Sequence, residues 1–190
     1  MIKEIINLDK QLFIFLNNLG SETWDSFWLL ISNKITMFCI IICFILFYSR
    51  RIKIKQWIYF ILFFILCVGV TDFLHVQLFK NIFMRLRPCW ESDLLNQMRP
   101  LLVDCGGYYG FISGHAANAT AMVVFLIYSF NIINKVNRFF LFGWVFLVAY
   151  SRIYLAKHYP LDVLFGVLFG FLTAVIVFKL YKYIVKKIII

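Results

Sequence analysis

His158 and Asp162 have the residue types and the spacing that nucleophilic chemistry needs. They lie four residues apart, and Pro160 between them stands at a position typical of the first residue of a helix. At that spacing the carboxylate can accept a hydrogen bond from one ring nitrogen, fix the tautomer and leave the other nitrogen free to attack. Taken alone, the pair is equally compatible with a structural histidine at the end of a membrane span.

Lys80, Arg87 and Arg152 supply positive charge at the ends of apolar segments. The planar fork of arginine suits phosphate oxygens, and lysine gives a compact point charge. Any one of them could simply anchor a span at the membrane surface. Arg152 is the hardest to explain in that way, because it lies within an apolar segment, where a charge is costly without a partner.

Ser113, Gly114 and His115 open another apolar segment. Serine is a good helix cap, glycine lets a ligand approach the backbone closely, and the free N–H groups at a helix start bind anions. Such caps are common, so this tripeptide by itself is a weak signal.

The elements that must position these residues are long and apolar. The 190 residues are 63% hydrophobic, 20% aromatic and 15% charged, a composition typical of a membrane protein and not of a soluble globule. We therefore expect a single membrane-embedded domain over residues 1–190, with an all-α fold: a multi-pass transmembrane helix bundle. About five spans are expected, at residues 33–49, 57–79, 112–133, 139–156 and 160–178.

Residues 1–34 are amphipathic and end in the aromatic side chains of Trp24, Phe27 and Trp28. This pattern predicts an N-terminal interfacial amphipathic helix that lies in the membrane surface. An additional short span is the alternative.

The charges predict an orientation. The linker at residues 50–55, the turn at 135–138 and the tail after residue 178 share one side of a five-span bundle, and they hold ten basic residues and no acidic ones. The positive-inside rule places that side, and with it the C-terminus, in the cytoplasm. The loop at 80–111 then faces outward, which in a bacterium is the periplasm. Because topology explains the net charge of +10, nucleic acid is not expected as a partner.

Together the polar blocks resemble the three-part signature of the type 2 phosphatidic-acid phosphatase superfamily. The order and internal spacings match over residues 80–162, and Ile112 stands where the family usually has proline. The matching blocks are Lys80-x6-Arg87-Pro88, Ser113-Gly114-His115 and Ser151-Arg152-x5-His158-x3-Asp162.

The resemblance implies a role for each residue. His158 would form a phosphohistidine with Asp162 orienting it, and His115 would protonate the leaving oxygen. No metal and no cofactor is implied, since cations stand where a metal enzyme would hold carboxylates. The phosphate would be cradled by Lys80, Arg87, Ser113, Gly114 and Arg152.

The implied activity is that of an integral-membrane, metal-independent lipid phosphatase with its active site in the periplasmic loop. Small bacterial members of the family act on lipid A phosphates, undecaprenyl diphosphate, phosphatidylglycerophosphate or phosphatidic acid. Small size and a cysteine-bearing outer loop favour lipid A here, with undecaprenyl diphosphate next. Phosphoryl transfer to another lipid stays open, as does the oligomeric state. A non-enzymatic alternative, a transporter or sensor for anionic lipids, would not need both histidines and Asp162.

Asp72 lies in the second expected span, two helical turns before Lys80. An acid at that depth is a functional candidate, but two turns are about 12 Å along a helix, too far for contact with a phosphate held by Lys80. We expect it to support a cation of the site, such as Arg152, from behind, and we expect the nearby His75 to be structural.

Four small residues have predicted structural roles. Cys89 and Cys105 fall in the outward loop, where oxidation is possible, and are expected to form a disulfide. Gly166 and Gly170 form a close-packing motif, expected to act within the molecule and not between two copies.

Overall fold

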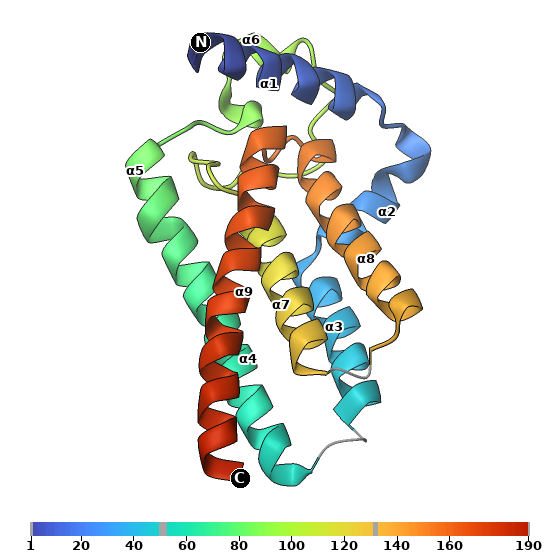
Figure 1. The fold of residues 1–190 in the computed structure, drawn as a ribbon. Coiled ribbons are helices and arrows are strands. Elements are labelled where there is room, and N and C mark those ends of the chain that lie inside the picture. Colours follow the sequence, from blue (N-terminus) through green and yellow to red (C-terminus); the bar gives the residue numbers. More distant parts are fainter. Residues whose placement is uncertain (1, 50–52, 131–132, 190) are drawn as a thin grey trace.

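The computed structural model describes residues 2–49, 53–130 and 133–189, which form a helical bundle with one helix lying across its end (Figure 1). Arg50 and Arg51 of the expected basic linker lie outside the described residues. The bundle consists of α3 (Lys34–Ser49), α4 (Ile54–His75, continued by the π-helical turn Val76–Lys80), α7 (Gly114–Ser129), α8 (Lys135–Tyr154) and α9 (Pro160–Ile189).

The helices differ in their ability to cross a membrane. Three stretches of the described chain are long and apolar enough: Ile54–Phe83, Lys135–Tyr154 and Pro160–Lys187. The pair α2 (Glu22–Ser32) and α3, bent by 63° at its break, makes a fourth if it acts as one span. Each of the five expected segments contains a helix of the bundle, but α3 and α7, with 16 residues each, are shorter than the ~20 that a full crossing takes.

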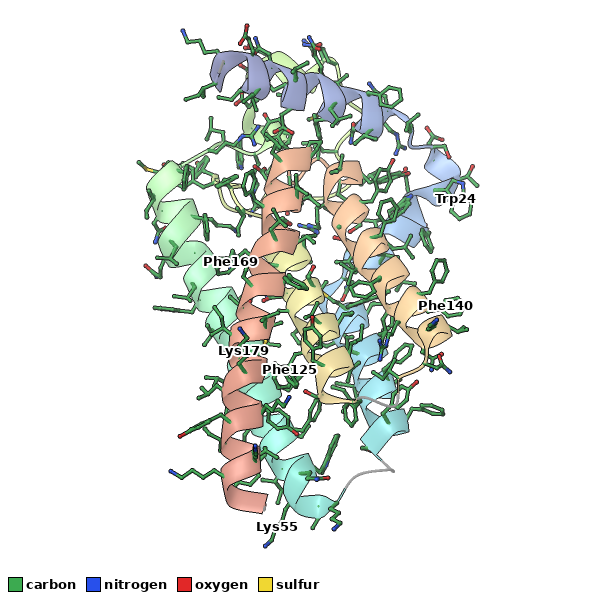
Figure 2. The ribbon with its side chains drawn as sticks, in the orientation of Figure 1. Trp24, Lys55, Phe125, Phe140, Phe169 and Lys179 are labelled. Atoms are coloured by element: carbon green, nitrogen blue, oxygen red, sulfur yellow. A yellow bond between two sulfur atoms is a disulfide. The ribbon has the colours of Figure 1, made fainter. Side chains whose placement is uncertain are left out.

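Helix α7 forms the centre of the bundle. Residues 116–127 are all buried, so this helix has neighbours on every side. Figure 2 labels Phe125 among the inner helices; its ring packs against those of Phe60, Phe178 and Tyr181.

Two glycines of α9 bring this helix against α7. A Cβ atom at Gly166 would lie 2.6 Å from the carbonyl oxygen of Ser113, and one at Gly170 only 2.1 Å from that of Ala117. No side chain fits at either place. The predicted close packing within the molecule is confirmed.

The N-terminal region is two helices, not one. Helix α1 (Ile2–Asn18) lies across the end of the bundle, next to the start of α9 and the end of α8, whereas α2 turns away at Gly20 and packs along α8 (Figure 1). Trp28 of α2 does not sit apart as a surface aromatic, because its ring contacts those of Tyr150 and Tyr154. The interfacial position predicted for residues 1–34 stays a prediction; exposed apolar side chains such as Leu8 of α1 are compatible with it.

The loop between α4 and α7 lies beneath α1. It contains three short turns of helix, α5 (Asn81–Phe83), η2 (Pro88–Trp90) and α6 (Ser92–Leu95). An ion pair of 2.7 Å between Lys10 of α1 and Glu91 ties the helix to this loop.

Candidate active site

The three signature blocks meet around one cavity of about 590 Å³. The first block reaches the cavity from the end of the helical stretch that begins with α4 and from the loop after it. The second block lies at the first turn of α7. The third block runs from the last turn of α8 into the loop before α9. Six of the eight residues expected to act on the phosphate line the cavity, and Ser113 and Asp162 do not; the six are Lys80, Arg87, Gly114, His115, Arg152 and His158.

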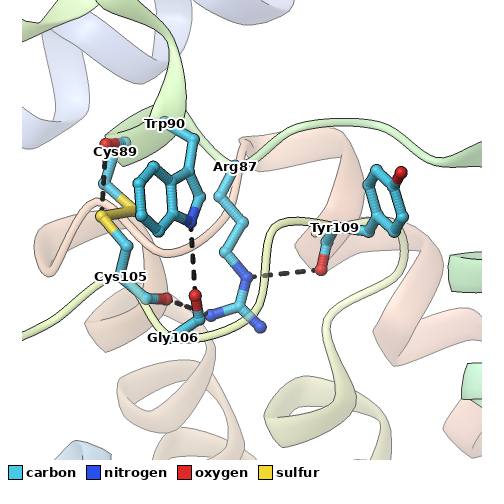
Figure 3. The surroundings of a disulfide bond; sticks show 6 residues. All are labelled: Arg87, Cys89, Trp90, Cys105, Gly106 and Tyr109. Carbon is cyan, nitrogen blue, oxygen red and sulfur yellow. Dashed lines mark hydrogen bonds between the residues drawn. A yellow bond between two sulfur atoms is a disulfide. The ribbon is translucent and has the colours of Figure 1, made fainter.

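Arg87 is fixed by backbone carbonyl groups of the outer loop (Figure 3). Its Nη1 donates to the carbonyl oxygen of Cys105 at 2.6 Å, and its Nε donates to that of Tyr109 at 3.3 Å. Because both acceptors are neutral, the guanidinium keeps its net charge for a ligand. Figure 3 also shows the disulfide that joins Cys105 to Cys89, whose Cα atoms are 5.9 Å apart. This covalent bond lies directly beside the acceptor that orients Arg87.

Arg152 is almost entirely buried and is held by α2. Its Nη1 donates to Oγ of Ser32, the last residue of that helix. Its Nε is buried and has no hydrogen-bond partner among the described residues. A buried donor left in this state costs roughly 1–3 kcal/mol unless a ligand accepts from it.

The expected pairing of Asp72 with Arg152 is wrong. Oδ1 of Asp72 accepts from Nδ2 of Asn118 at 2.8 Å and lies 3.9 Å from Nδ1 of His75. Helix α4 packs on α7, so Asp72 faces α7, whereas Arg152 faces α2. Asp72 also lines the cavity itself, so it is not hidden behind the site.

The serine and the glycine of the second block have different surroundings. The Ser113 side chain is fully buried and caps α7, since its Oγ accepts from the backbone nitrogen of Ala116 at 3.5 Å. Its own N–H donates to the carbonyl oxygen of Asp162 at 2.9 Å, which joins the second block to the third. Gly114 lines the cavity and packs against His75, whose Nε2 would lie 2.5 Å from an added Cβ.

His158 and Asp162 lie side by side and are both buried. Nδ1 of His158 is 3.7 Å from Oδ2 of Asp162, so Nε2 is the ring nitrogen left for chemistry. Burial lowers the pKa of His158 well below its usual 6.5, and the nearby charges of Arg152 and Arg87 lower it further. The imidazole is therefore neutral at physiological pH, the form that a nucleophile requires.

Asp162 is held from two sides. Its Oδ2 accepts from the backbone nitrogen of Tyr159 at 3.0 Å, and its Oδ1 accepts from Nη1 of Arg85 at 2.8 Å. Sequence reasoning assigned no role to Arg85, although it stands in the basic block that begins with Lys80. Nor did it assign one to Asp9, which binds the other side of the same guanidinium.

Lys34 is another residue that the sequence did not single out. It lies at the first position of α3 and lines the cavity beside the expected cations. A lysine at the end of a span has no feature that separates it from an ordinary anchor. Among the described residues, no group of three or more His, Cys, Asp or Glu side chains is placed to hold a metal ion.

The sequence of residues 60–186 matches a known family. The PAP2 superfamily matches residues 60–186, two thirds of the chain, which include all three polar blocks. The chain belongs to the PAP2 superfamily. Similar proteins include a lipid A 4'-phosphatase of Porphyromonas gingivalis, 32% identical over 94% of this chain and 75% of that protein. A lipid A 4'-phosphatase of Bacteroides thetaiotaomicron is 28% identical over 90% of this chain and 75% of that protein.

A solved structure has the same fold. The crystal structure of Aquifex aeolicus LpxE superposes with a TM-score of 0.63 at 24% identity, covering 89% of this chain and 93% of that one. The expected all-α membrane fold and the family resemblance are both confirmed.

Proposed function

We propose that this protein removes a phosphate group from lipid A, with its active site on the periplasmic face of the cytoplasmic membrane. The observation that carries the proposal is that His115, His158 and the expected cations line a single cavity. A phosphate monoester carries roughly −1.5 to −2 charges at neutral pH, which these cations would balance.

The proposed reaction has two steps. Nε2 of His158 attacks phosphorus, the bond from phosphorus to the lipid oxygen breaks, and His115 gives a proton to that leaving oxygen. Water then attacks the phosphohistidine, His115 takes a proton from it, and inorganic phosphate leaves. Asp162 accepts from Nδ1 and stabilises the positive ring that forms in the first step.

Each proposed phosphate ligand has a physical reason. Lys80, Arg87 and Arg152 line the cavity. The Nε of Arg152, which has no hydrogen-bond partner in the described part of the chain, is a donor that a phosphate oxygen would satisfy. Gly114 lines it at the start of α7, where backbone N–H groups favour an anion. For Ser113 we propose an indirect role, through the cap that orients this first turn.

The choice of lipid A comes from the relatives. Both proteins named lipid A 4'-phosphatase align with at least 90% of this chain. The periplasmic placement of the site comes from the ten basic residues expected on the opposite side of the bundle. With the site placed there, the C-terminus lies in the cytoplasm.

The test is phosphate release by the purified protein in detergent with excess EDTA. The panel contains lipid A, undecaprenyl diphosphate, phosphatidylglycerophosphate and phosphatidic acid, with His158→Ala as the control. We expect release from lipid A that EDTA leaves intact and that the variant lacks. Release from another lipid alone would overturn the choice of substrate, and release that EDTA abolishes would overturn the metal-free mechanism.

A further inference from the structure

The interfacial helix α1 reaches the catalytic dyad through one arginine. Arg85 donates from Nη2 to Oδ2 of Asp9 at 2.6 Å and from Nη1 to Oδ1 of Asp162 at 2.8 Å. The two carboxylates come from opposite ends of the chain, and a single guanidinium spans them. Asp162 is the residue that faces the ring of His158.

Arg85 is held by buried carboxylates and by an aromatic ring. The side chains of Asp9 and Asp162 are 1% and 0% exposed, and that of Arg85 is 20% exposed. Its guanidinium lies 4.0 Å from the ring centroid of Tyr159, within the range of a cation–π contact. That ring is packed edge-on by Phe13 of α1, with 5.5 Å between the centroids.

Asp9 makes a second contact with the segment that carries the dyad. Its Oδ1 accepts from the backbone nitrogen of Leu161 at 2.9 Å, within the loop and first turn that run from His158 to Asp162. The carboxylate of α1 is therefore bound both to this backbone and to the cation that holds Asp162. A helix with so many exposed apolar side chains needs no buried acid to lie on a membrane, so the acid calls for another explanation.

We infer that Asp9 and Arg85 are positioning residues for the reaction, which hold the carboxylate of Asp162 in the orientation that His158 needs. This inference rests on the proposed roles of His158 and Asp162. With both carboxylates ionised, the group formed by Asp9, Arg85 and Asp162 carries one net negative charge, which faces the imidazole as it becomes positive. An Arg85–Asp162 pair alone would be neutral and would stabilise the imidazolium less.

Each partner is needed for a different reason. Without Arg85, two buried carboxylates would be left close together, and one of them would take up a proton. Without the charge of Asp9, Arg85 would be drawn wholly toward Asp162 and would pull it from the ring. Lysine cannot replace Arg85, because a single ammonium group lacks the fork that reaches two carboxylates.

The chain offers a matched control for the anchoring of α1. Lys10, the next residue, forms an ion pair with Glu91 that also ties α1 to the loop at 2.7 Å but does not touch the dyad. Lys10→Met therefore removes an anchor of α1 and leaves Asp162 and its partners in place. A merely structural role of α1 predicts equal effects of Lys10→Met and Asp9→Asn.

The experiment compares kcat and KM for lipid A in the wild type, Asp9→Asn, Arg85→Lys and Lys10→Met, with thermal unfolding measured for each. Since a displacement of about 1 Å at a reacting group can cost about 100-fold, we expect kcat to fall by about 10- to 100-fold in Asp9→Asn and Arg85→Lys. We expect KM to stay within about threefold, because neither residue lines the cavity, and Lys10→Met to keep both constants within about twofold. Asp9→Glu, which keeps the charge, should recover part of kcat.

The outcomes separate this inference from the function on which it rests. A wild type that releases no phosphate would refute the proposed function. An active wild type with Asp9→Asn unchanged, or with Asp9→Asn and Lys10→Met equally impaired, would overturn the positioning role. If Asp9→Asn does not fold, Arg85→Lys decides, because it keeps both carboxylates and a cation: an unchanged kcat there would overturn the inference.

Discussion

Oδ2 of Asp162 lies 3.7 Å from Nδ1 of His158 and 3.0 Å from the backbone nitrogen of Tyr159. At 3.0 Å the backbone N–H of Tyr159 donates a hydrogen bond to this carboxylate, whereas 3.7 Å is too long for a hydrogen bond from His158. Catalytic hydrogen bonds are often long before substrate binds and shorten in the reacting complex. We therefore expect the carboxylate to close on the ring as the ring gains positive charge.

Replacing Asp162 by asparagine should leave the protein folded but slow. The amide oxygen can still accept from Tyr159, but the side chain no longer carries the charge that fixes the tautomer of His158. By analogy with other oriented histidines, we expect kcat to fall about 10²- to 10⁴-fold, while His158→Ala falls to background. Phosphate release would measure activity, and circular dichroism would measure folding. Unchanged turnover of Asp162→Asn would show that Asp162 has no part in the mechanism.

The acid limb of the pH profile should lie below pH 6.5. Only the neutral imidazole of His158 can attack, and burial together with the charges of Arg152 and Arg87 lowers the pKa of this group well below 6.5. Activity should therefore persist as the pH falls through 6.5 and decline only at lower pH. The measurement is kcat/KM against pH, with the titration of the substrate phosphate followed separately. An acid limb at or above pH 6.5 that does not coincide with the titration of the substrate phosphate would contradict the role of neutral His158 as the nucleophile.

The difference in stability between the wild type and Lys157→Met should depend on pH. Burial, with help from Arg152 and Arg87, lowers the pKa of this lysine to about 8, against 10.5 for the unfolded chain. Between these two values the unfolded state binds more protons, so the contribution of Lys157 to stability rises with pH over that window. Thermal unfolding of the wild type relative to Lys157→Met should show the wild type gaining from pH 8 to pH 10. A constant difference would refute the shift.

Reduction of the disulfide should weaken phosphate binding as well as stability. The bond closes a loop between residues 89 and 105, for which the chain-entropy relation gives about 3 kcal/mol. Since Arg87 donates to the carbonyl oxygen of Cys105, loosening that backbone should raise KM more than it lowers kcat. Cys105→Ser would be compared with Cys39→Ser, a free exposed cysteine of α3. Two alkylatable thiols in protein isolated without reductant would contradict the bond.

Gly170→Ala should destabilise the bundle. The new methyl group would meet the carbonyl oxygen of Ala117, and such overpacking costs typically about 1–3 kcal/mol. Gly143→Ala in α8 is the matched control, because nothing lies within 4 Å of its added Cβ and alanine favours a helix by up to about 1 kcal/mol. Thermal unfolding in detergent would measure both, and equal midpoints would argue against close contact of α7 and α9.

Much of this architecture could be predicted from the sequence, because its signals are local. Apolar runs mark the helices, and the resemblance of the three polar blocks to the family signature implies a shared site without knowledge of the fold. The Gly166 and Gly170 spacing likewise predicts close packing, since it places both residues on one helix face. The lengths of the helices were harder to predict, because α7 is buried by its neighbours and need not match the bilayer on its own.

The partners of the charged residues could not be predicted in the same way. Asp72 bonds to Asn118 and not to Arg152 because the packing of α4 on α7 sets its direction. Asp9 resembles any polar residue of an amphipathic helix until α1 is laid across the end of α9. Which face of α1 turns inward depends on contacts with residues more than 70 positions away.

The cations around the cavity also bear on how a catalytic cycle ends. Inorganic phosphate, the second product, has the same charge and the same oxygens as the group that Lys80, Arg87 and Arg152 would bind in the substrate. A site that holds the reacting group well therefore also retains the product. Turnover would then be limited by the departure of phosphate, and free phosphate in the surrounding solution would act as a competitive inhibitor that slows the enzyme when phosphate is abundant.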